Sequence, residues 1–148
     1  MVMMVVAIIS VIALPKMEND SVLLSTQAEQ LANDIRYVQS LAMTQATTVP
    51  SQARYRINFV SASTYTFTKA DGTAVPHPLT GSTAATGLSS GVTMTSGNSL
   101  IGFDGRGIPY TDAAVSSVLG GTATITLTKN AATRTVTVAP QTGLVRVP

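Results

Sequence analysis

The amino-acid sequence predicts an α+β fold in which one long N-terminal helix packs against an antiparallel β-sheet domain. Residues 1–14 are apolar apart from Ser10, and residues 21–44 contain neither Gly nor Pro while repeating apolar side chains at helical spacing. The later part of the chain instead alternates apolar and polar residues, as half-buried strands do. We therefore expect a helix over residues 1–46 and a β-rich globular domain over residues 47–148.

The apolar run is followed at once by polar residues from Lys16 onward, so nothing close to it in the sequence can cover it. A fourteen-residue helix spans about 21 Å, which is short of the roughly 30 Å hydrocarbon core. A signal peptide is the alternative, but it would need a basic leading segment and a small-residue cleavage site. We expect an anchor that packs in a bilayer or against copies of itself, with residues missing from the front. Its candidate core side chains are Met1, Val2, Val5, Val6, Ile8, Ile9, Ile12 and Leu14.

The second half of the predicted helix, residues 21–44, carries one apolar face. Pro15 is expected to kink the helix before this half, because proline lacks the N–H of the helical ladder. Asp20 or Ser21 could cap a new start, so a break near residues 15–20 and a smooth curve both remain open. The apolar face is expected to pack on the chain's own sheet, with a coiled coil as the alternative. It follows a 4,3,4,3 spacing through Leu24, Ala28, Leu31, Ile35 and Val38.

Strands are predicted wherever apolar residues alternate with polar ones. Asp71-Gly72 is a tight-turn signal, and the Pro- and Gly-rich residues 76–91 indicate a loop. The clearest hairpin turns at Lys129–Ala132 between two Thr-rich strands. We expect one antiparallel sheet built mainly from residues 54–147, with strands at Arg54–Val60, Tyr65–Phe67, Val92–Thr95, Leu100–Phe103, Ala123–Thr128, Thr135–Val138 and Leu144–Val147.

The residue types argue for a structural role and against catalysis. There is no Cys, which excludes disulfides, thiolate metal sites and cysteine nucleophiles. The single histidine, His77, lies between two prolines, and the seven acidic residues are scattered. We expect neither an enzyme nor a cofactor or metal site, and we interpret Asp104–Gly107 as a plain turn and not as an anion cradle.

The positive charge is weak and dispersed. The net charge is +2, and the nine basic residues occur singly, so the sequence contains no polybasic stretch for nucleic acid. Lys129, Arg134 and Arg146 are kept as candidate DNA contacts, because they could gather on one face of the predicted hairpin and phosphate contacts need no sequence motif.

The opening Met1–Pro15 resembles the apolar N-terminal helix of type IV pilins and type II secretion pseudopilins. Later segments resemble the C-terminal β-domain of the GspH/FimT-like minor subunits of that family. These segments are Ile101–Gly107, Thr124–Thr128, Arg134–Val138 and Gly143–Val147.

The resemblance implies a pilin-like fold and a structural subunit of a type IV pilus or a type II secretion pseudopilus. Before assembly, such a subunit is anchored in the inner membrane by a single N-terminal span. Assembly machinery then extracts it into a periplasmic or extracellular filament, where it packs against copies of itself or other pilin subunits. The resemblance leaves open whether the subunit is major or minor.

Two departures from the family pattern bear on this interpretation. Family precursors have a basic leader ending in Gly and a Phe-Thr-Leu-Ile-Glu-like start, and Met1 falls about where that glutamate would be. Leader cleavage and N-terminal methylation are therefore implied only for a chain that begins upstream. Some FimT-like subunits capture DNA through a Gly-Arg-x-Arg motif, but here Leu144 follows Gly143, so DNA binding is the lesser alternative.

Overall fold

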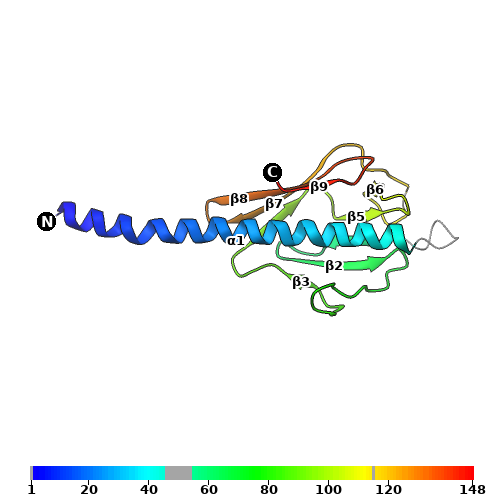
Figure 1. The fold of residues 1–148 in the computed structure, drawn as a ribbon, viewed down its shortest axis with the longest axis horizontal. Helices are drawn as coiled ribbons and strands as arrows, with labels where there is room; N and C mark the ends of the chain where they lie inside the picture. Colours follow the sequence, from blue (N-terminus) through cyan, green and yellow to red (C-terminus); the bar gives the residue numbers. More distant parts are fainter. Residues whose placement is uncertain (1, 46–54, 115) are drawn as a thin grey trace.

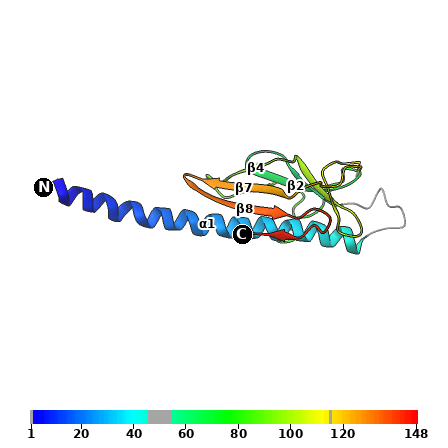
Figure 2. The same cartoon turned by 90° about the horizontal axis from the view of Figure 1, so that it is seen from above.

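The computed structural model describes the backbone of residues 2–45, 55–114 and 116–148, and side chains within those ranges from Asp20 onward. One helix, α1 (Val2–Thr44), runs the length of the molecule (Figure 1). Its second half lies against two antiparallel sheets, and its N-terminal part projects beyond them (Figures 1 and 2). The predicted α+β arrangement of one N-terminal helix on antiparallel strands is confirmed.

The strands form two sheets, where the sequence analysis expected one. The five-stranded sheet has the order β3-β2-β1-β5-β6, and the four-stranded sheet has the order β4-β7-β8-β9. The first contains β1 (Tyr55–Phe59), β2 (Thr64–Lys69), β3 (Thr86–Gly87), β5 (Leu100–Phe103) and β6 (Pro109–Tyr110). The second contains β4 (Thr93–Ser96), β7 (Ala123–Lys129), β8 (Ala132–Val138) and β9 (Val145–Arg146).

The alternating sequence pattern decides which face of each sheet meets the helix. On β1 and β2 the register pairs Ile57 with Phe67, and both side chains are buried. On β7 and β8 it pairs Ile125 with Val136, which have no exposed surface. The threonines between these positions form the outer face, because successive strand residues point to opposite sides. Both sheets thus present an apolar face to α1, which lies against β1, β5, β7, β8 and β9.

Several predicted boundaries shift by one to three residues, and the largest shift is at β8, which begins at Ala132 and not at Thr135. The last strand is shorter than Leu144–Val147, and the strand near Val92 begins at Thr93. The short pairings β3 and β6 were not predicted, since two residues are too few to show an alternation. Arg54 and the predicted boundary between residues 46 and 47 lie outside the described residues.

Helix α1 is continuous through Pro15, so the break considered between residues 15 and 20 is absent. The kink at Pro15 remains a prediction. Between Asp20 and Thr44 the helix is held by tertiary contacts with both sheets, which contribute more to helix stability than intrinsic propensity does.

Candidate functional site

The first candidate surface is the N-terminal part of α1, which extends past the sheets (Figure 1). The predicted anchor positions from Val2 to Leu14 lie on this part, and Met1 lies outside the described residues. In the portion of the chain that the structure describes, no helix combines the length and apolarity needed to cross a bilayer. In both ribbon views this part of α1 projects beyond the two sheets (Figures 1 and 2).

The second half of α1 is fixed in the domain by its apolar face. All five residues predicted for helix–sheet packing lie in one core cluster with at most 1% of their surface exposed: Leu24, Ala28, Leu31, Ile35 and Val38. Burial of each Leu, Ile or Val side chain in this set contributes about 1.5–3 kcal/mol. The two sheets therefore hold this half of the helix in place within the domain.

Two polar side chains of α1 tie the C-terminal region of the domain to the helix. The Gln39 amide donates to the carbonyl oxygens of Gly107 at 3.0 Å and Thr142 at 3.1 Å. The Arg36 guanidinium donates to the carbonyl oxygen of Val145 at 2.9 Å. This bond lies on the edge of β9 that pairs with no other strand of the sheet. The end of the chain thus lies beside residues 36–39 of the helix.

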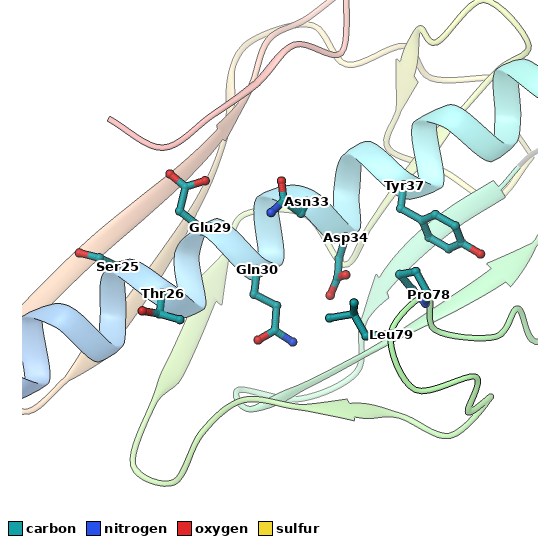
Figure 3. A pocket seen from close by; sticks show the side chains of 9 residues that line it. All are labelled: Ser25, Thr26, Glu29, Gln30, Asn33, Asp34, Tyr37, Pro78 and Leu79. Atoms are coloured by element: carbon teal, nitrogen blue, oxygen red, sulfur yellow. The ribbon is translucent and has the colours of Figure 1, made fainter.

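A groove of about 750 Å³ runs along the solvent-facing side of α1 (Figure 3). One wall comes from the loop after β2, where Leu79 is 78% exposed beside Pro78. Gln30 and Asp34 extend from the helix toward this wall in Figure 3. The lining includes the acids Glu29 and Asp34 and no basic residue, and its other members are Ser25, Thr26, Asn33 and Tyr37.

A buried hydrogen-bond network lies beneath the groove. Asp34 is 2% exposed, and its Oδ2 accepts the Tyr65 hydroxyl at 2.5 Å and meets His77 Nε2 at 3.1 Å. The N–H of Leu79 donates to His77 Nδ1 at 3.2 Å, so in the neutral ring Nε2 carries the proton and donates to Asp34. Burial, with the bond to Asp34, raises the pKa of Tyr65, and the phenol stays protonated as a donor. The network fastens the loop that bears Leu79 to α1.

The sequence analysis missed this network. It placed His77 in a loop, and the backbone is indeed irregular there, but the ring is only 3% exposed. A signal was present in the helix, because Asp34 lies three residues after Leu31 and four before Val38, on the predicted apolar face. A carboxylate at such a position requires a buried donor, and the tertiary structure supplies two.

The candidate DNA contacts do not gather on one face. Lys129 Nζ lies 3.2 Å from Asp20 Oδ1, and Arg134 Nε donates to the Ser25 hydroxyl at 3.1 Å. Arg146 pairs with Thr137 in the β8–β9 register, which places it on the outer face of the sheet, opposite Arg134. The structure therefore separates Arg146 from the two basic residues that contact α1.

The turn after β5 is built by its own carboxylate. Asp104 Oδ1 accepts the backbone N–H groups of Arg106 and Ile108, both at 2.9 Å. Burial opposes ionisation of Asp104, but these N–H groups and the Arg106 guanidinium outweigh it and lower its pKa. The N–H groups are thus occupied, in agreement with a plain turn. Among the residues described, no three His, Asp or Glu side chains converge on a metal-sized site.

A family model described as Type II transport protein GspH matches residues 27–142. The chain belongs to the GspH family. The match runs from the buried half of α1 to the turn before β9, and so covers the strands from β1 to β8. Neither the curated proteins nor the solved structures gave a match. The resemblance to GspH/FimT-like subunits is confirmed.

Membership in the GspH family assigns this chain a structural role of the pseudopilin type. It is a subunit of a pseudopilus or pilus-like filament, periplasmic or extracellular, and it associates with other pilin or pseudopilin subunits. The surfaces that matter are consequently contact surfaces between subunits.

Proposed function

We propose that this GspH-family subunit is held in the inner membrane by the apolar N-terminal part of α1 and then assembles into a helical filament through the same segment. The observation that supports the proposal is the division of α1 into two halves. The second half is buried by both sheets, whereas the first extends beyond them with an apolar sequence (Figure 2). Such a segment gains free energy only by finding an apolar environment outside its own domain.

The free energy gained by burying the anchor is sufficient both for membrane binding and for packing in a filament core. Each large apolar side chain of the anchor contributes about 1.5–3 kcal/mol when fully buried. Val2, Val5, Ile8, Ile9 and Ile12 offer several such contributions per subunit. In a filament the same contacts repeat along the core, so extraction from lipid exchanges one apolar environment for another.

The alternative is DNA capture of the FimT-like kind. It has less support, because Lys129 and Arg134 already contact α1 and the Gly-Arg-x-Arg pattern has Leu144 in place of its first arginine. No function as an enzyme is proposed.

The proposal is tested with Ile9→Asp in the full chain, expressed together with its assembly machinery. A carboxylate at the centre of a membrane helix costs about 3 kcal/mol. We expect Ile9→Asp to lower the ratio of membrane-bound to unbound protein about a hundredfold and to abolish filaments seen by immunogold electron microscopy.

Thr124→Asp is the matched control, because it adds the same charge on an exposed residue of β7. It should leave both the membrane-bound fraction and the filaments unchanged. The proposal fails if Ile9→Asp behaves like this control.

A further inference from the structure

The loop that carries Leu79 is organised around His77, which bonds to it through three groups. The backbone N–H of His77 donates to the carbonyl oxygen of Ser82, and its own carbonyl oxygen accepts the N–H of Gly81, both at 2.8 Å. Its ring atom Nδ1 accepts the N–H of Leu79 at 3.2 Å. Residues 77–82 therefore form a closed loop, called the His77 loop below.

The His77 ring is held by regular elements, whereas the tip of the loop, residues 78–80, is not. Nε2 of the ring lies 3.1 Å from Asp34 Oδ2 on α1, and the ring centre lies 5.5 Å from that of Phe67 on β2. In the described part of the chain, the bond from Leu79 to Nδ1 is the one hydrogen bond recorded for the backbone of the tip. The place of the tip thus depends on one ring nitrogen, while the ring itself is fixed independently.

The two ring nitrogens have opposite roles, and only a neutral ring can fill both. In the neutral ring Nε2 donates to Asp34 and Nδ1 accepts from Leu79. In an imidazolium both nitrogens are donors. The inner bond would then become an ion pair with the Asp34 carboxylate, but the new N–H at Nδ1 would face the N–H of Leu79. Two donors cannot bond each other, so protonation strengthens the inner contact and breaks the outer one.

The groups around the ring leave few sources of a charge change at mild pH. Histidine is the side chain whose charge ordinarily changes between pH 5 and pH 8, and residues 76–91 contain no other titratable side chain. Asp34 faces the ring from α1 and Tyr65 from β2, while Tyr37 borders the loop. Both tyrosines are neutral in this interval, and Glu29 is directed away from the loop in Figure 3. A response of the loop to mild acid would therefore originate at the contact between the ring and Asp34.

We propose that His77 is a pH-sensitive latch on the wall of the groove. At neutral pH the ring holds the N–H of Leu79 and keeps the tip against the groove. Mild acid protonates Nδ1 and releases the tip, while Nε2 keeps the base of the loop on α1. Because Pro78 and Leu79 line the groove, its shape then differs between the two forms. This inference does not depend on the filament role.

The test measures solvent exchange of single amides by NMR, with the full chain in mild detergent at pH 8 and at pH 5. After correction for the intrinsic exchange rate, protection of the Leu79 amide should fall at least about fivefold at pH 5, as loss of one hydrogen bond requires. The internal control is the Ala84 amide, which donates to Ser82 Oγ at 3.1 Å. It has the same spacing to a side-chain acceptor, but a hydroxyl does not titrate there. Equal changes at Leu79 and Ala84, or none at either, would overturn the latch.

Two variants identify the group that titrates. In Asp34→Asn the amide oxygen can take the place of Oδ2, which accepts from both Tyr65 and His77, so the variant removes only the charge. Without the carboxylate the imidazolium is less favoured, and the pH midpoint of release should fall by about one unit or more. His77→Gln should make the exchange of the Leu79 amide independent of pH. An unchanged midpoint in the first variant, or a persistent pH dependence in the second, would contradict the proposal.

The ring provides a separate readout that needs no variant. In the wild type the ¹⁵N chemical shifts of the imidazole should show a bare Nδ1 and a protonated Nε2 at pH 8. They should change to the imidazolium values over the same pH range in which the Leu79 amide loses protection. A ring that is already protonated on Nδ1 at pH 8, or that titrates without a change at Leu79, would overturn the proposal even if neither variant folds.

Discussion

Gly143 lies where the turn between β8 and β9 meets α1 and the turn after β5, and its replacement by alanine tests the packing of this region. Its φ of +64° is in the left-handed region. A Cβ at this position would lie 2.6 Å from the carbonyl oxygen of Gly107 and 2.9 Å from an edge carbon of the Phe103 ring. It would also lie 2.5 Å from Gln39 Nε2, which holds the two turns to the helix.

Gly143→Ala should lower the free energy of unfolding for two reasons. The left-handed conformation costs an alanine about 1–2 kcal/mol. Overpacking against a backbone oxygen and a buried ring adds about 1–3 kcal/mol, because neither can move without shifting its neighbours. Gly81 is a control that distinguishes the conformational cost from the overpacking cost, because its φ is +67° but a Cβ there would meet no atom within 4 Å. Gly81→Ala should therefore lose only the conformational part.

The assay is urea unfolding of the full chain in mild detergent, followed by tyrosine fluorescence because the chain has no tryptophan. A difference of about 2 kcal/mol between the two variants corresponds to about 1 M in the urea midpoint, for a slope of about 2 kcal/mol per M. Equal midpoints for Gly143→Ala and Gly81→Ala would refute the argument that close packing, and not conformation, makes Gly143 necessary.

Two further predictions concern buried carboxylates. Asp34→Ala should lower the free energy of unfolding by about 3 kcal/mol, because the Tyr65 hydroxyl and His77 Nε2 would both lose their acceptor. Asn33→Ala, on the exposed neighbouring residue, should change it by less than about 1 kcal/mol by the same urea assay; similar losses would contradict a structural role for the network. Asp104→Asn should change the pH dependence of unfolding, because the folded pKa of Asp104 lies below its unfolded value. The advantage of the wild type should be complete above the unfolded pKa of about 3.9 and should disappear as the pH falls through the lower folded pKa. A midpoint difference between the two proteins that stays constant from pH 7 to pH 2 would contradict it.

The helix is the element that the sequence predicts best. The apolar spacing from Leu24 to Val38 follows the 3.6-residue period, and local periodicity is enough to define one face. The hairpin of β7 and β8 was equally predictable from the sequence, because apolar and polar residues alternate along both strands and the two strands are adjacent in the chain. The division into two sheets could not be predicted from the sequence. β5 pairs with β1 and β4 pairs with β7, and such non-local pairings do not change the local pattern of apolar and polar residues.

The sequence by itself determined the long N-terminal helix with an uncovered apolar end, the β-rich domain and the likeness to the GspH family. These features depend on composition, on periodicity and on short segments. Only the tertiary structure decided which charges are paired and which surfaces are exposed. Lys129 and Arg134 reach α1 across more than a hundred residues of sequence, and Asp34 meets His77 across 43. The physical reason is that a pairing of side chains depends on distance in space, which the fold sets, whereas a periodic pattern depends only on neighbours along the chain.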